Sequence, residues 1–213
     1  MKLAVCIEIS SRMRTKDILN ALRRAHIPYI NLGMTGDPKE PELTYIETSF
    51  ISALFLNLKI VDIVIGGCGT GQGYLNAVMQ YPNICAGLIL DPVDAFLFSQ
   101  INAGNVVSLA LNKGYGTFGA EINLDYIFEK LFSTPAGGGY PEHRASSQKE
   151  SRQRLVGISE LTHYSMQEIL KALPREFVLQ CLNFPGILDH IVAAPNSALK
   201  DEVISLVTSD KIE

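Results

Sequence analysis

The stretch that decides the fold is VDIVIGGCGTGQGYLNAV, residues 61–78. Strand-forming residues lead directly into a segment, residues 66–73, that holds five glycines in eight positions, and a helical pattern follows it. Cys68 lies among these glycines, at the end of the expected strand. A buried strand that ends in a turn before a helix is typical of α/β proteins, whose ligands lie beyond the carboxyl ends of parallel strands.

The same alternation runs through the first two-thirds of the chain. Apolar segments predict strands over residues 2–9, 29–33, 61–67, 85–90 and 105–111. Apolar residues at helical spacing predict helices over residues 15–27, 41–58, 73–81, 92–103 and 117–134. Strands that are apolar throughout, each followed by a helix, indicate a doubly wound parallel sheet that is covered on both faces.

Residues 135–154, PAGGGYPEHRASSQKESRQR, interrupt this pattern. Their content of Gly, Pro, Ser and charged residues predicts a loop or linker. Three short helices are expected after it, over 165–173, 175–183 and 199–209. We therefore expect an α/β domain over 1–134, a linker over 135–154 and a small helical C-terminal extension over 155–213.

Composition limits the classes of function. The net charge is −4 with no basic stripe, so a nucleic-acid partner is not expected. No signal peptide and no apolar run of membrane-spanning length is recognised, so we expect a cytoplasmic protein without membrane partners. The cysteines are far apart and lack a Cys-x-x-Cys pair, which argues against disulfides and structural zinc. Three of them are expected to be small buried residues: Cys6, Cys85 and Cys181.

The glycine-rich segment admits several interpretations. A dinucleotide-binding fingerprint fits poorly, because the segment follows a later strand and its glycine spacing differs. A phosphate-binding loop of the Walker type needs a Lys-Ser/Thr ending that is missing here. A tight strand-to-helix turn explains one or two glycines. Five glycines fit better with an anion cradle, in which backbone N–H groups and the start of a helix face a ligand.

A thiol in such a cradle suggests acid–base chemistry. Cys68, close to the positive end of the helix, would be partly ionised. A thiolate beside N–H donors forms a base next to an oxyanion hole, which suits removal of a proton from a carbon adjacent to a carbonyl. The alternative of a purely structural turn stays open.

These residues resemble the ribose-5-phosphate isomerase B and galactose-6-phosphate isomerase family. That family has a strand, Cys-Gly-Thr-Gly and a helix, matched here by residues 68–71. Residues 84–105, ICAGLILDPVDAFLFSQINAGN, are similar to its next strand and helix, and residues 44–47, TYIE, resemble a further segment. The resemblance covers about the first 155 residues. It implies a Rossmann-like, three-layer sandwich and a homodimer with active sites at the subunit interface, which interconverts aldose and ketose phosphates without a metal or nucleotide cofactor.

The resemblance also implies roles for individual residues. Cys68 would be the base that moves a proton between C1 and C2, and Thr70 would assist it. The N–H groups of the glycines would bind the enediolate. The residues expected to bind substrate are Glu8, Tyr45, Gly69, Gly71, Gly73, Asn102, Arg152 and Arg154. Asn102 would act from the neighbouring subunit, and His143 and Arg144 are reserve candidates for anion binding. Gln72 stands where one branch of the family has a glutamate base, which leaves Cys68 as the only base in the motif.

Each of these residues also has a structural interpretation. Thr70 and Glu8 are suited to capping helices, and Tyr45 is suited to packing at the rim of the core. Asn102 could end a helix in the left-handed conformation, and the arginines could belong to a solvated face. We expect structural roles for His26, His163 and His190.

Two departures from the family pattern limit the substrate. The histidine of its N-terminal Asp-His pair is Ile9 here, and its ring-opening histidine is Ile101. We expect an aldose–ketose isomerase of a small sugar phosphate that acts through an enediolate. The alternatives are a non-catalytic sugar-phosphate-binding protein and an isomerase or epimerase of a sugar acid.

Overall fold

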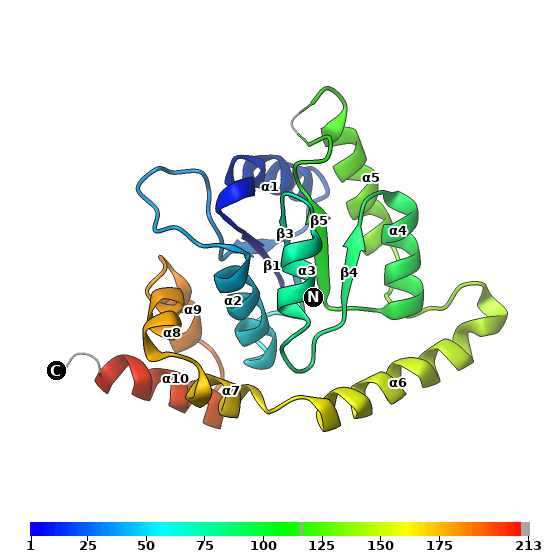
Figure 1. Ribbon diagram of the computed structural model, residues 1–213. Coiled ribbons are helices and arrows are strands. Elements are labelled where there is room, and N and C mark those ends of the chain that lie inside the picture. The colour runs from blue at the N-terminus through cyan, green and yellow to red at the C-terminus, as the bar shows by residue number, and fades with distance from the viewer. Residues whose placement is uncertain (116, 210–213) are drawn as a thin grey trace.

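A parallel sheet forms the centre of the protein. The computed structural model describes residues 1–115 and 117–209, and in this part of the chain five parallel strands pair in the order β2-β1-β3-β5-β4 (Figure 1). The strands are β1 (Leu3–Ile7), β2 (Tyr29–Asn31), β3 (Ile63–Cys68), β4 (Ala86–Ile89) and β5 (Val106–Ala110). Every predicted strand is present, and the doubly wound α/β fold is confirmed.

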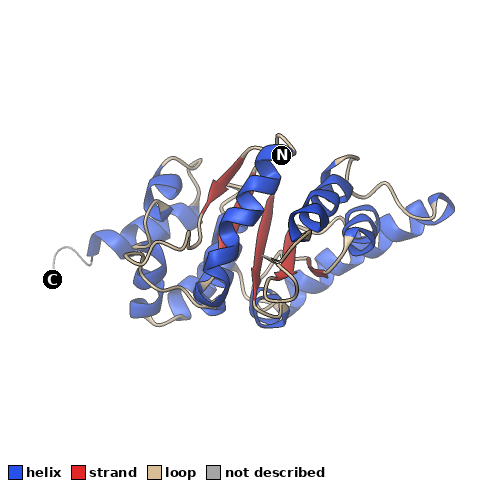
Figure 2. Cartoon of the chain, turned by 90° about the horizontal axis from the view of Figure 1, so that it is seen from above, coloured by secondary structure: helices blue, strands red, loops and turns tan. Residues whose placement is uncertain are grey.

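Helices cover both faces of the sheet and make three layers (Figure 2). One face carries α1 (Thr15–Arg24), α4 (Pro92–Leu97), the π-helix η2 (Phe98–Asn102) and α5 (Ala120–Phe132). The other face carries α2 (Tyr45–Asn57) and α3 (Gln72–Val78). Side chains of strand β1 alternate between the two faces. Val5 and Ile7 join the core under α1 and α5, and Ala4 and Cys6 join the core under α2.

Helix α2 begins later than its sequence suggests. The predicted start was Pro41, but the first helical residue is Tyr45. Thr44 forms a capping box with Glu47, whose carboxylate accepts a hydrogen bond from the Thr44 N–H at 2.7 Å. This cap fixes the first turn of α2, and with it the position of Tyr45.

The loop predicted over 135–154 is wrong for its second half. After the short 3-10 helix η3 (Glu142–Arg144), helix α6 spans Ala145–Thr162. The segment 145–154 is polar but lacks Gly and Pro, so polarity alone misled the prediction. Helix α6 extends along one edge of the molecule (Figure 1), and none of its residues is buried. No helix within the described residues is both long and apolar enough to cross a membrane.

The C-terminal extension consists of short helices. Its elements after α6 are α7 (Met166–Ala172), α8 (Arg175–Leu182), α9 (Ile187–Val192) and α10 (Ala198–Ser209). Helix α9 was not predicted, because it has only six residues between Pro185 and Pro195. The last residues of the predicted extension, 210–213, lie outside the described residues.

The extension shares a hydrophobic core with α2. The Phe177 ring lies 5.4 Å from the Phe50 ring, centroid to centroid, in an edge-to-face contact. Leu182, only 1% exposed, joins the cluster that contains Phe50 and Leu54. Each such buried side chain stabilises the fold by about 1.5–3 kcal/mol. The extension therefore supports the helix that carries Tyr45.

We predict that Leu182→Ala lowers the free energy of unfolding of the whole chain by about 2–5 kcal/mol, because it leaves a cavity in the shared core. Val192→Ala, on the same extension but 60% exposed, is the matched control and should change it by less than about 0.5 kcal/mol. Denaturant unfolding followed by circular dichroism measures both. A separate early transition confined to the extension would contradict a shared core.

Candidate active site

The carboxyl edge of the sheet gathers the polar residues that follow three neighbouring strands. Ile7 of β1 pairs with Gly67 of β3, and Cys68 of β3 pairs with Ala110 of β5. Glu8, Cys68 and Asn112 therefore leave the sheet at one edge, where parallel α/β folds place their ligands.

Two glycines of the motif are required by packing. A methyl group on the Gly66 Cα would lie 2.1 Å from the Tyr74 ring, and one on Gly67 would lie 2.3 Å from the Leu109 carbonyl oxygen. Gly67 also has a φ of +152°, which disfavours other residues. Both glycines lie within β3, where Gly66 makes room for the Tyr74 ring of α3 and Gly67 makes room for the backbone of β5, so a structural interpretation holds for this pair.

Gly69 and Gly73 have a different environment, because polar and reactive side chains surround them. A methyl group on Gly73 would lie 3.4 Å from the Tyr45 ring and 3.5 Å from the Cys68 Sγ. A methyl group on Gly69 would lie 2.7 Å from the Asn112 Nδ2. The absence of a side chain at these two positions means that no Cβ stands against the sulfur or the Asn112 amide from the loop.

Cys68 is the last residue of β3 and is 6% exposed. Its Sγ lies 3.9 Å from the Thr70 Oγ1. Tyr45, 40% exposed, borders the same space from the first turn of α2. The structure thus brings together a thiol, a hydroxyl and an aromatic ring from β3, the glycine loop and α2.

The backbone N–H groups of the loop divide into two sets. The Gly71 N–H donates to the Cys68 carbonyl oxygen at 3.2 Å, and the Gln72 N–H donates to the Thr70 Oγ1 at 3.3 Å. Gly71 is thus held by the turn itself, with a φ of +74°. The N–H groups of Gly69, Thr70 and Gly73 have no acceptor among the described residues, so all three are available to a ligand.

Glu8 is nearly fully buried, at 2% exposed, and caps the 3-10 helix η1 (Ile9–Arg14). One carboxylate oxygen accepts a hydrogen bond from the Ser10 N–H at 2.8 Å, and the other accepts one from the Ser10 hydroxyl. The capping alternative for this carboxylate therefore matches the structure. Its role toward a ligand stays a prediction.

Sequence reasoning missed two residues at this edge. Asn112 donates its N–H to the Gly69 carbonyl oxygen at 2.9 Å and directs its side-chain amide at the Gly69 Cα. A methyl group added to Gly69 would lie 3.6 Å from the Ser10 Oγ. Both follow an apolar strand directly or within a few residues, and that position alone could have identified them.

The other predicted ligands form a second group at the opposite edge. Asn102 is exposed and ends η2, and Ala103, not Asn102, takes the left-handed conformation there, with a φ of +45°. Arg152 donates to the Ile101 carbonyl oxygen at 2.7 Å and to the Gly137 carbonyl oxygen at 3.2 Å. Asn102 and Arg152 line one cavity of about 360 Å³. They lie beyond the amino-terminal ends of the strands, away from Cys68 of the same chain.

Arg154 and the reserve residues do not join either group. Arg154 is exposed on α6 and pairs with Glu150 at 2.7 Å. His143 and Arg144 are exposed in η3. Their roles as anion ligands therefore stay predictions.

The other thiols differ from Cys68 in their surroundings. Burial raises the pKa of Cys6 to about 12 and also raises the pKa of Cys181 above its ordinary value, so both stay protonated at neutral pH. Both are fully buried, as expected. Cys85 is only partly buried, contrary to expectation, and burial raises the pKa of its thiol as well.

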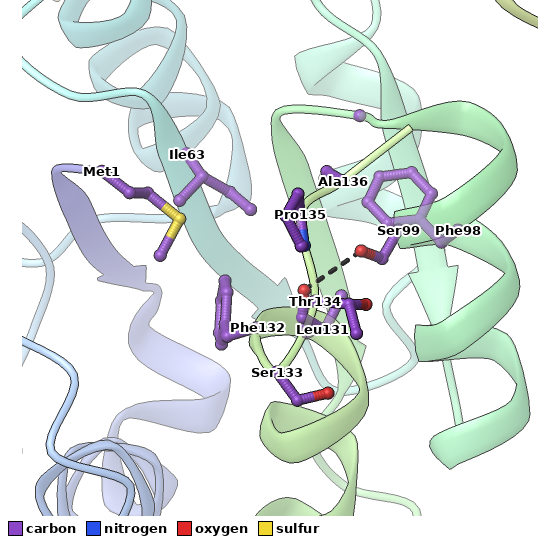
Figure 3. Close-up of a pocket in the computed structure, with 11 residues that line it drawn as sticks. Met1, Ile63, Phe98, Ser99, Leu131, Phe132, Ser133, Thr134, Pro135 and Ala136 are labelled. Carbon is purple, nitrogen blue, oxygen red and sulfur yellow. Dashed lines mark hydrogen bonds between the residues drawn. The ribbon is translucent and has the colours of Figure 1, made fainter. Parts of the chain in front are cut away.

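A further cavity of about 450 Å³ lies at the amino-terminal edge of the sheet (Figure 3). Its lining is mostly apolar and includes Met1, Ile63 and Phe98. Ile63 is the first residue of β3 and Cys68 the last, so this cavity is at the wrong end of the strand to serve the thiol.

Comparison with known proteins identifies the family. The family model for ribose/galactose isomerase matches residues 9–146, more than half of the chain. No curated protein sequence matches the chain. Among solved structures, a 4-deoxy-L-threo-5-hexosulose-uronate ketol-isomerase in complex with a tartrate is 34% identical, with a TM-score of 0.91 over 98% of this chain and 100% of that one.

Two further structures are those of proteins named ribose-5-phosphate isomerases. The one from Vibrio parahaemolyticus is 34% identical, with a TM-score of 0.90 over 97% of this chain and 99% of that one. The one from Thermotoga maritima is 26% identical, with a TM-score of 0.55 over 70% of this chain and 97% of that one. The first two similarities extend through the C-terminal helices, whereas the shorter third one leaves part of the chain unmatched. The chain thus belongs to the ribose/galactose isomerase family and is a sugar isomerase.

Proposed function

We propose that this enzyme interconverts the aldose and ketose forms of a small anionic sugar, with Cys68 as the base. The observation that carries the proposal is the position of Cys68. Its sulfur lies at the carboxyl edge of the sheet, 3.9 Å from the Thr70 hydroxyl, and the loop that follows it has N–H groups without an acceptor. A base beside preorganised donors suits a reaction that passes through an enediolate.

The proton balance of this reaction needs one base and no external reagent. The Cys68 thiolate takes the proton from C2 of the aldose, and the C1 carbonyl oxygen becomes an enediolate oxygen. The N–H groups of Gly69 and Gly73 and the Thr70 hydroxyl stabilise that negative charge. The thiol then returns its proton to C1, while the hydroxyl proton of O2 moves to O1, so the ketose forms with no net gain or loss of atoms.

The substrate we favour is an open-chain sugar acid. Ile9 and Ile101 replace the histidines of the family pattern, and an alkyl group cannot protonate a ring oxygen. The four histidines of the chain lie elsewhere: His26 after α1, His143 in η3, His163 after α6 and His190 in α9. The similarity to a uronate ketol-isomerase supports a carboxylate as the anion.

A sugar phosphate is the second candidate. The protein from Vibrio parahaemolyticus, equally similar to this chain, is named a ribose-5-phosphate isomerase. Guanidinium groups bind phosphate and carboxylate with the same geometry, so the predicted arginines do not separate the two. A comparison of turnover on uronates and on ribose 5-phosphate decides between them.

The separation of the predicted ligands supports a homodimer with shared sites. Asn102 and Arg152 lie at the edge of the sheet opposite Cys68, so one chain cannot bring them to its own thiol. Helix α6 beside them presents exposed apolar side chains, each 54–88% exposed: Leu155, Val156, Ile158 and Leu161. A second copy seated on this face by two-fold symmetry would cover these side chains and bring its Cys68 to this Asn102.

We predict that Cys68→Ala lowers kcat by at least about 100-fold, because it removes the general base. The melting temperature should stay close to that of the wild type, since the thiol is small. Cys181→Ala, which removes a thiol from the core shared by α2 and the extension, is the control and should retain activity. Wild-type turnover by Cys68→Ala would exclude the thiol from the mechanism.

We predict that Gly73→Ala folds normally but loses activity. The new methyl group makes ordinary contacts of 3.4–3.5 Å with the Tyr45 ring and Cys68, so it fills the space beside the sulfur. Replacement of glycine in a helix also stabilises it by up to about 1 kcal/mol. Asn76→Ala, at an exposed position of the same helix, should leave activity unchanged. An active Gly73→Ala enzyme would show that substrate approaches from another side.

Shared sites predict complementation between two inactive variants. Cys68→Ala and Asn102→Ala dimers should each be impaired, whereas a mixed dimer holds one intact site, made of Cys68 from one chain and Asn102 from the other. Random reassociation after denaturation should then restore about one quarter of wild-type activity, since half of the dimers are mixed and each has one working site. No gain over the unmixed variants would place both residues outside a shared site.

A further inference from the structure

Arg12 and Arg14 are the arginines nearest in sequence to the carboxyl edge. Both belong to η1, which begins directly after Glu8 and contacts β3. Ser10 of the same helix reaches the Gly69 loop. A 3-10 helix rises about 2 Å per residue, so the two arginines start within a few residues and roughly 4–8 Å of Ser10 along its axis.

These two arginines differ from the others in having no partner. Every other arginine of the chain has a hydrogen-bond or ion-pair partner: Arg23, Arg24, Arg144, Arg152, Arg154 and Arg175. Arg12 and Arg14 have neither kind of partner within residues 1–115 and 117–209. Both are nevertheless partly buried, so donors of two guanidinium groups are left without an acceptor.

The neighbouring carboxylates do not neutralise them. Glu8 is committed to the N–H and hydroxyl of Ser10. Asp17 lies one turn beyond Arg14, yet one of its carboxylate oxygens is buried without a hydrogen bond, and it pairs with neither arginine. Two positive charges without a protein partner, on the short helix whose Ser10 reaches the Gly69 loop, suit an anion supplied from outside the chain.

We infer that Arg12 and Arg14 bind the acid group of the substrate, at the end remote from the carbons that exchange a proton. The inference rests on the proposed function for the identity of that substrate. It assigns anion binding to η1 of the same chain that supplies Cys68. Arg152, which was predicted for this role, is instead bonded to two backbone carbonyl groups.

The test uses Arg12→Gln and Arg14→Gln in the full-length enzyme, with Lys16→Gln as the control. Lys16 is exposed and lies two residues from Arg14, and its replacement by Gln removes one positive charge, as the arginine substitutions do. Tartrate, a dicarboxylate, is the binding probe, measured by calorimetry at fixed ionic strength. We expect each arginine-to-glutamine variant to weaken the binding of tartrate about tenfold or more, since hydrogen bonds between charged groups are strong. Lys16→Gln should change binding less than twofold.

Kinetics on the uronate distinguish a failed inference from a failed function. We expect KM to rise about tenfold with kcat within about threefold of the wild type, because the arginines bind the anion and do not move the proton. Arg12→Lys and Arg14→Lys keep the positive charge and should recover part of the affinity for tartrate. They replace the glutamine variants in the test if a glutamine variant does not fold. The inference is overturned if all three glutamine variants weaken tartrate binding equally, or if none of them weakens it. Turnover of the wild-type enzyme would leave the proposed function intact in both cases. Tartrate binding that depends on the arginines in an enzyme inactive on sugars would overturn the proposed function alone.

Discussion

The site depends on the lack of space where β3 meets α3. The Tyr74 ring and the Leu109 backbone occupy the positions that side chains at 66 and 67 would need. Glycine at 66 allows α3 to pack closely onto β3, and glycine at 67 allows the backbone of β5 to approach β3. The turn into α3 ends β3 at Cys68, at the rim of the sheet and not in its centre, before a loop with N–H groups that no other protein group uses. A larger residue at 66 or 67 would move the loop and with it every group around the sulfur.

The fold could be predicted from sequence because its signals are local and repeated. Apolar strands such as 105–111, each followed or preceded by a helix, leave a covered parallel sheet as the consistent solution. The errors arose where composition and structure disagree. Residues 145–154 are polar enough for a loop but contain no residue that breaks a helix, and α9 is too short to show a period. The shared core of α2 and the extension depends on contacts such as Phe50–Phe177, which are distant in sequence.

The site could be predicted in part for the same reason. Cys68, Thr70 and their glycines are contiguous, so one motif reveals them, and Tyr45 came from a resemblance to the family. Asn112 and Ser10 carry no motif, and only the alignment of strand ends places them beside Gly69. The resemblance already placed Asn102 in the neighbouring subunit, but the position of Arg152 beside it at the other edge depends on where η2 and α6 lie in space. In the proposed homodimer, a second subunit would cover the exposed apolar side chains of α6.

The central claim is that the Cys68 sulfur moves a proton between adjacent sugar carbons. The most direct measurement is the incorporation of solvent deuterium into substrate and product in D₂O, followed by NMR. The proton on the thiol can exchange with solvent while the enediolate is bound, so the account predicts deuterium at the carbon that receives the proton in the wild-type enzyme. It predicts none above background in Cys68→Ser under the same conditions. Deuterium incorporated equally by both enzymes would assign the base to another group and contradict the claim.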